Sequence, residues 1–344
     1  MLRSTTTHHG DRCGRDGGSR SSVRRRSAAK RNLSSGGDAI GRHAYEATIA
    51  NRLYGIVYAY DRFYPTLTLA ASQFDDNFVL SSGREQTAVT NRVVAQMSVP
   101  FRKVQWQTAG SIGLIRDHIR GDVPQGLFRG TLQGIRAGAF FNNSHEYPFS
   151  ISPEHGITAN ADYENLSRSL GSDRSLQTIR GDVRGYITIP YASAPIGRHV
   201  VAVRAAGGHN SGDFLLQRQL KVGGDSTGEL TTLDIRNFPV RGFDEGTLRG
   251  GSAAIASIEY RFPLYEIDRG PTTWPIFFNR VHGDVFTDAG RVGGAHIASA
   301  GAEGTVDFII ANGLLIQYRA GVAIRLTDPD KHRLVPYISI GSSF

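Results

Sequence analysis

The sequence is short of cysteine and of long apolar runs, and both shortages narrow the classes of protein that it can encode. Its 344 residues contain a single cysteine, Cys13. One cysteine cannot form an intramolecular disulfide, and no Cys/His cluster has zinc spacing, so we expect neither a disulfide scaffold nor a metal site. No run approaches the roughly 18 consecutive apolar residues of a transmembrane helix, which excludes a helical membrane protein but not membrane-spanning strands.

Unbalanced charge is confined to the N-terminus. The formal net charge is +8, but residues 1–42 hold ten of the 39 basic residues and only three of the 31 acidic ones. The remaining chain is almost neutral, so its charge gives no reason to propose a nucleic-acid partner. Residues 1–42 are rich in Ser, Gly and Arg with few large apolar side chains, and we expect this basic segment to be disordered. It also lacks the apolar stretch of a secretory signal.

From residue 43 onward, apolar and polar residues alternate with a period of two. In "LLIQYRAGVAIRL", residues 314–326, every second side chain from Leu314 to Leu326 is apolar or aromatic, while Arg319 and Arg325 lie on the other face. This alternation runs over thirteen residues, whereas a typical soluble strand has about 5 to 6. Each such strand has one apolar and one charged face.

The same pattern predicts about fourteen antiparallel strands joined mostly by short polar turns. Their expected ranges are 45–52, 53–62, 65–75, 84–98, 103–118, 126–142, 155–166, 174–189, 197–208, 250–262, 276–289, 298–311, 314–326 and 333–344. One connection, 209–249, is about forty residues long, and a loop of that length is usually functional or disordered.

Two architectures can use such strands. In a soluble sandwich the apolar faces form the core between two stacked sheets. In a membrane barrel the apolar faces meet lipid, and the charged faces line the lumen. Strand length favours the barrel, because a tilted membrane-spanning strand needs roughly 9 to 11 residues. We therefore predict an all-β protein whose residues 43–344 form a transmembrane antiparallel up-and-down β-barrel.

The C-terminus supports this prediction. The chain ends "LVPYISIGSSF", and Ile338, Ile340 and Phe344 fall on one face of the last expected strand. Outer-membrane barrels use a terminal strand that ends on an aromatic residue as an assembly signal. We predict the same role for these three residues.

Four motifs follow one another in the C-terminal half. They are "VRGF" (Val240, Arg241, Gly242 and Phe243) in the long connection, "ASIEYRFPL" at 256–264, "GDVFTDAGRV" at 283–292 and "YISIGSSF" at 337–344. In this order, and with five strands after the long connection, they resemble the barrel of the bacterial surface-antigen family, the outer-membrane assembly factors of BamA and TamA type. The motifs cover about 240–344, and the alternation extends the likeness back to about residue 43.

The resemblance implies that the long connection folds back into the barrel and that Arg241 contacts Glu259 and Asp288 on the inner wall. An arginine fork can satisfy two carboxylates, which a lysine cannot match in geometry. Gly242 then allows a tight turn, and Phe243 wedges against the wall. The competing interpretation is that Arg241 is a solvated loop charge and that both acids are ordinary lumen charges, paired with Arg261 or Arg280.

We find no catalytic group in the sequence. His282 and Asp284 are i, i+2 neighbours on one polar face, which we interpret as lumen lining. The run "GGHNSGD" at 207–213 lacks the lysine and the helix of a phosphate-binding loop. We therefore expect no enzymatic activity and no cofactor.

The resemblance implies insertion or translocation of client proteins, either outer-membrane or secreted, at the bacterial outer membrane. The lipids of that membrane are then partners, as are accessory assembly lipoproteins or POTRA modules. POTRA modules bind client proteins, and none can be placed in residues 1–42. The family's barrel has sixteen strands, so the chain is expected to be either a truncated form or a smaller relative. Two other classes stay open: a passive pore or a barrel that displays or exports a fused domain, and a soluble β-sandwich that binds a ligand.

Overall fold

The computed structural model describes residues 32–37, 42–50, 53–60, 64–79, 85–120, 128–147, 150–194, 197–224, 236–271, 276–310, 314–327 and 330–341. Fifteen strands form one antiparallel sheet, in which each strand pairs with the one before it and the one after it, except that β10 pairs directly with β14. The strands are β1 (Asn32–Gly37), β2 (His43–Ala50), β3 (Leu53–Tyr60), β4 (Thr66–Val79), β5 (Glu85–Arg102), β6 (Gln107–Arg120), β7 (Gly130–Asn142), β8 (Gly156–Leu166), β9 (Leu176–Ala194), β10 (Gly197–Gly212), β14 (Ser252–Arg269), β15 (Ile276–Val292), β16 (Ala295–Ile310), β17 (Leu314–Arg325) and β18 (Leu334–Gly341).

All fourteen strands that the alternation predicts have a counterpart in this sheet, and the up-and-down connectivity is confirmed. The ends differ by a few residues. β9 reaches Ala194 and β14 reaches Arg269, five and seven residues beyond their predicted ends. Backbone pairing continues there after the strict alternation of side chains has stopped, and only the alternation is visible in the sequence.

Strand β1 lies within the segment 1–42 that we expected to be disordered. Asn32–Gly37 pairs antiparallel with β2 from Asn32 opposite Ile49 to Gly37 opposite Ala44. The expectation is therefore wrong for these six residues, because a strand edge supplies hydrogen bonds to any backbone, whatever its side chains. The rest of 1–42, apart from Arg42, lies outside the described residues.

The apolar face of the sheet is exposed and the polar face is buried, which is the reverse of what a soluble protein shows. On the apolar face Ile258 is 57% exposed and Val322 is 44% exposed, whereas on the polar face Asp288 is 3% exposed and Arg325 is 7% exposed. A water-soluble sandwich would bury the first pair and expose the second. Fifteen of the described strands form one curved sheet with a charged interior, so the sandwich alternative is wrong.

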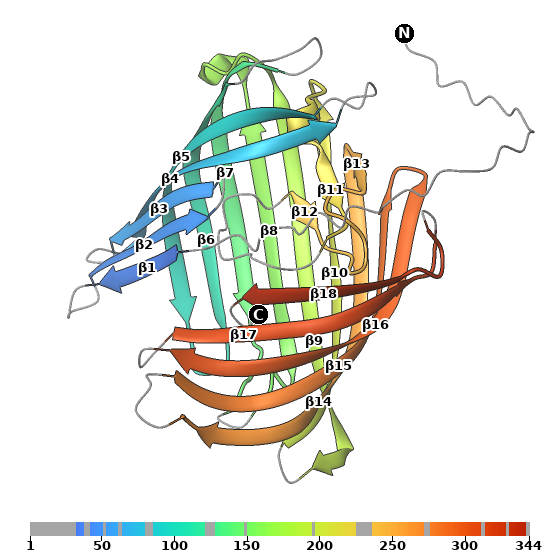
Figure 1. Cartoon of the computed structure of the whole chain (residues 1–344). Coiled ribbons are helices and arrows are strands. Elements are labelled where there is room, and N and C mark those ends of the chain that lie inside the picture. The colour runs from blue at the N-terminus through green and yellow to red at the C-terminus, as the bar shows by residue number, and fades with distance from the viewer. Residues whose placement is uncertain are drawn as a thin grey trace, which may run out of the picture.

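The sheet curves into an open barrel, with a small second sheet on its concave side (Figure 1). This second sheet belongs to the long loop, which in the structure runs from residue 213 to 251. It contains β11 (Leu220–Val222), β12 (Asn237–Phe238) and β13 (Leu248–Gly250). Among the described residues no pairing joins β18 to β1, and a seam lies between them.

Helical structure in the described part of the chain is limited to two short 3₁₀ turns, η1 (Arg168–Leu170) and η2 (Leu216–Arg218). No described helix has the length and apolar character that crossing a membrane requires.

The three residues of the predicted assembly signal lie at the end of the sheet or beyond it. Ile338 is on β18 and is 66% exposed, and Ile340 pairs through its backbone with Tyr318 of β17. Phe344 lies outside the described residues. Their role in assembly stays a prediction.

Candidate functional site

The long loop presents Arg241 at a turn that its own small sheet holds in place. β12 pairs parallel with β11, and β13 pairs antiparallel with the other edge of β11. An isolated bridge joins Gly224 to Val240, and the Gly224 backbone N–H donates to the Phe243 carbonyl at 3.0 Å. Backbone hydrogen bonds therefore fix both sides of the turn, which lowers the entropy that its arginine loses on binding.

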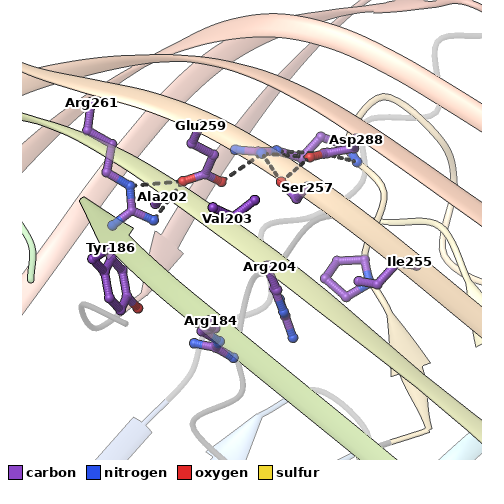
Figure 2. Close-up of a pocket in the computed structure, with 12 residues that line it drawn as sticks. Arg184, Tyr186, Ala202, Val203, Arg204, Ile255, Ser257, Glu259, Arg261 and Asp288 are labelled. Carbon is purple, nitrogen blue, oxygen red and sulfur yellow. Dashed lines mark hydrogen bonds and ion pairs between the residues drawn. The ribbon is translucent and has the colours of Figure 1, made fainter. Parts of the chain in front are cut away.

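The guanidinium of Arg241 binds two carboxylates of the barrel wall. Its Nε and Nη2 donate to the two oxygens of Asp288, each at 2.8 Å, and its backbone N–H donates to the same side chain at 3.1 Å. Nη2 also lies 2.7 Å from Oε1 of Glu259. Glu259 and Asp288 come from adjacent strands, β14 and β15, and project into the lumen (Figure 2). The arrangement is a charge-assisted fork shared by two acids.

Burial strengthens this cluster. The Arg241 side chain is 9% exposed. Burial acts to lower the pKa of Arg241, but the hydrogen bonds to Asp288 and the negative charge of Glu259 outweigh it, and the pKa lies well above its ordinary value. The guanidinium is therefore permanently charged, and removing Arg241 would leave the buried Asp288 carboxylate without its cation.

Three further contacts surround the fork. The Arg241 guanidinium lies over the ring of Phe286, 3.5 Å from its centroid, in a cation–π contact. Ser257 donates its hydroxyl to Asp288 at 2.6 Å, and Arg241 Nη2 lies 3.3 Å from the Ser257 oxygen. Oδ1 of Asp284 lies 3.8 Å from Arg241 Nη1.

Gly242 lies very close to the wall. Its φ is +86°, and a Cβ at this position would lie 2.7 Å from the Cβ of Ala323 on β17. Both the backbone conformation and the space require glycine. The Gly242 carbonyl accepts a hydrogen bond from Arg325 Nε at 2.7 Å, and the Arg325 guanidinium lies over the ring of Phe243.

The base of the tip is apolar. Val240 and Val222 are completely buried in a cluster with Ile255 of β14 and Ile297 of β16. Gly290 of β15 leaves room for them, because a Cβ there would lie 2.6 Å from Val222 and 2.9 Å from Val240. A small hydrophobic core thus joins the loop to the inner wall.

The structure brings together the residues that the sequence placed in one site: Val240, Arg241, Gly242, Phe243, Glu259 and Asp288. The competing interpretation paired the two acids with Arg261 or Arg280. It is correct in part for Glu259, which binds Arg261 at 2.6 Å as well as Arg241. Arg280 instead contacts the Ser150 carbonyl and Asp307. Arg241 is buried, so it is not a solvated loop charge.

Sequence reasoning missed Ser257, Phe286 and Arg325. Ser257 lies on the polar face of β14 together with Glu259, where nothing singles it out, whereas Phe286 is an aromatic residue on the polar face of β15. Arg325 belongs to a strand outside the recognised motifs. No sequence signal distinguishes these three from other lumen residues, since their role arises from where the loop tip is placed.

A pocket opens beside the tip, and its lining includes Arg184, Tyr186, Arg204 and Arg261 (Figure 2). Arg184 and Arg204 both bind Asp182, at 3.1 and 2.5 Å, so the pocket wall already contains paired charges. No group of three or more His, Cys, Asp or Glu side chains within the described residues has a geometry that holds a metal ion.

Comparisons with known proteins agree with this architecture. No curated protein sequence matches the chain. The structure is similar to that of CdiB from Acinetobacter baumannii, with a TM-score of 0.63 and 14% sequence identity over 89% of this chain and 55% of that one. This likeness concerns the fold alone, and the chain spans about half the length of that protein.

A family model provides the assignment. The Omp85 superfamily domain matches residues 138–329. The matched region begins in β7, ends just after β17, and includes the long loop together with Glu259 and Asp288. Because the match takes in more than half of the sequence, the chain belongs to the Omp85 superfamily.

Proposed function

We propose that this chain is an outer-membrane barrel that inserts or translocates client proteins, and that Arg241 holds the long loop inside its lumen. The observation that carries the proposal is the buried fork of Arg241 on Glu259 and Asp288, in a sheet whose apolar face is exposed. Membership of the Omp85 superfamily supports the same class of function.

The proposed action is physical and makes or breaks no covalent bond. The seam between β1 and β18 offers unpaired strand edges, to which a strand of a client protein adds by backbone hydrogen bonding. The loop, fixed at its tip, meanwhile prevents the lumen from acting as an open pore. The polar lumen wall and the apolar outer face support this division of roles.

The partners follow from the same proposal. The exposed apolar face, which includes Ile258 and Val285, contacts the lipids of the bacterial outer membrane. Client outer-membrane or secreted proteins engage the seam. Accessory assembly lipoproteins, or POTRA modules, deliver these clients.

The test begins with the location of the full chain expressed in a Gram-negative host. We expect it to fractionate with outer membranes and to migrate on gels in a heat-modifiable way, as a folded barrel does. Recovery only in the soluble fraction would rule out the proposal at this step.

The second step separates assembly from passive conduction. The full chain is reconstituted in liposomes, and the folding of a small unfolded outer-membrane barrel into the same liposomes is followed by heat-modifiable migration. We expect faster client folding than in empty liposomes, unchanged in Arg249→Ala, which alters an exposed residue of the long loop, and slower in Arg241→Ala. Ion conductance without any acceleration of client folding would instead identify a pore or an export barrel.

A further inference from the structure

The start of the long loop carries a second buried arginine, far from the tip in sequence. Arg218 is the last residue of η2, and its side chain is 5% exposed. Its Nη2 lies 2.5 Å from Oδ2 of Asp117 on β6, and its Nη1 lies 2.9 Å from Oε1 of Glu164 on β8. The loop thus makes a second fork across two carboxylates of the wall.

A wall arginine completes this second cluster. Arg92 of β5 binds both oxygens of Asp117, with Nε to Oδ1 and Nη2 to Oδ2 each at 2.8 Å. Arg92, Asp117 and Glu164 are all buried. Among these four charged groups only Arg218 belongs to the loop, and a further buried arginine of the loop, Arg236, lies beside them and donates to the Gln217 carbonyl.

Apolar and backbone contacts hold the same segment. Leu215 is 7% exposed and belongs to a hydrophobic cluster with Ile115, Ile119 and Leu132 of the wall. The side-chain amide of Gln217 donates to the Phe128 carbonyl at 2.9 Å. Residues 215–218, which we call the loop root, are therefore packed as a piece of the interior.

The root and the tip contact different parts of the wall. Arg218 binds side chains of β6 and β8, whereas Arg241 binds side chains of β14 and β15. In the sheet, β9 and β10 separate these two groups of strands. No side chain is shared between the two forks, so we expect that breaking one leaves the ion pairs of the other in place.

We propose that Arg218 is a second, independent anchor of the long loop, which holds the root against β6 and β8 when the Arg241 tip is released. The loop is then a strap fixed at two points across the lumen, and release of the tip moves only the part that follows the root. This inference depends on the contacts of the loop and not on the nature of any client.

The experiment places a reporter thiol at each attachment point. In a Cys13→Ser background, which removes the natural cysteine, Leu215→Cys reports on the root and Val240→Cys on the tip, and both positions are buried. Each protein is folded into liposomes, and its rate of reaction with a membrane-impermeant maleimide is measured. A thiol reacts only when its segment leaves the wall.

Three variants are compared on each reporter. Arg241→Ala releases the tip. The double variant Arg218→Met with Glu164→Gln removes one cation and one anion together, so that the Arg92–Asp117 pair remains and no charge is orphaned. Arg168→Ala is the matched control, because it breaks the exposed ion pair with Asp213 at the entrance of the same loop.

We expect Arg241→Ala to accelerate labelling at Val240→Cys about tenfold or more and to leave Leu215→Cys within about twofold of the parent. The Arg218 double variant gives the opposite pattern, and the control changes neither rate. The inference is overturned if Arg241→Ala exposes both reporters equally, or if the Arg218 double variant leaves the root rate unchanged. The effect of Arg241→Ala on the two reporters tests the inference even if the Arg218 double variant does not fold.

A conservative variant separates anchoring from simple stabilisation of the barrel. Arg218→Lys keeps the charge but reaches only one of Asp117 and Glu164. We expect the labelling rate at Leu215→Cys to lie between the rates of the parent and of the double variant. The heat-modifiable migration of the barrel should be unchanged. Equal labelling in the parent and in Arg218→Lys would show that the fork is unnecessary and would contradict the proposal.

Discussion

Arg241 binds both carboxylate oxygens of Asp288, through Nε to Oδ2 and through Nη2 to Oδ1, at 2.8 Å each. The two parallel hydrogen bonds fix the plane of the guanidinium as well as its position. The loop tip is therefore set in one orientation, with Val240 on the wall and Gly242 against β17.

Replacing Arg241 should loosen the tip in steps. Arg241→Lys retains a charge but loses the fork, and we expect about 1–3 kcal/mol less free energy holding the tip in place. Arg241→Ala leaves the buried Asp288 without its cation, while Glu259 keeps its ion pair with Arg261, and should cost about 3–5 kcal/mol. Limited proteolysis within the long loop measures both. Arg249→Ala, at an exposed position of the same loop, is the control, and equal cleavage in all four proteins would refute the anchoring role.

The two acids should not be equivalent. Asp288→Asn removes the bidentate partner of Arg241, whereas Glu259→Gln leaves the bond to Asp288 intact and acts mainly on Arg261, which also binds Glu259. We expect Asp288→Asn to release the tip more, by about 1–3 kcal/mol. Hydrogen exchange of the backbone amides at 240–243 reports this difference. A larger effect of Glu259→Gln would reverse the assigned order.

Gly242→Ala should displace the tip even though the change is small. The new methyl group would meet Ala323 at 2.7 Å, in a backbone conformation that disfavours any side chain. We expect raised ion conductance in planar bilayers, because the tip cannot seat fully. Adding Ala323→Gly should restore only part of the parent behaviour, since it relieves the clash but not the backbone strain.

The control for this prediction is Gly294→Ala, in the turn between β15 and β16, where a Cβ meets no atom within 4 Å. Its conductance should match that of the parent protein. If Gly242→Ala and Gly294→Ala behave alike, the close approach at β17 has no influence on the lumen.

A charge on the outer face should destabilise the barrel only at membrane depth. Ile258 of β14 is exposed beside the buried fork, and Ile258→Arg should cost up to about 2–4 kcal/mol in liposomes. Val104→Arg, in the exposed turn between β5 and β6, should cost little. Urea unfolding followed by tryptophan fluorescence compares the two. Similar costs would mean that the apolar face near Ile258 does not contact lipid.

The sequence was sufficient to predict the strands and the tip because both leave periodic or ordered signals. Alternation from Leu314 to Leu326 shows which side chains face outward, and the resemblance carried by the four ordered motifs implies that Arg241 contacts Glu259 and Asp288. Strand β1 leaves no such signal, because "NLSSGG" has no apolar alternation although its backbone pairs with β2.

The Arg218 anchor was equally invisible in the sequence. Its partners Asp117 and Glu164 lie 101 and 54 residues away, on strands that neither adjoin the loop in sequence nor belong to a motif. Only the path of the long loop through the lumen brings them together. A buried charge cluster of this kind depends on tertiary folding and has no local pattern.

At Gly290 the wall of the barrel is completed by side chains of the loop. By omitting a side chain this glycine leaves a hollow in β15, and Val222 and Val240 fill that hollow beside Ile255 and Ile297. If residues 213–251 were deleted, these wall residues would face water instead of hydrocarbon. Such a deletion would remove the loop's part of a hydrophobic core, and would not simply open the lumen. The loop is in this sense part of the folded core of the protein.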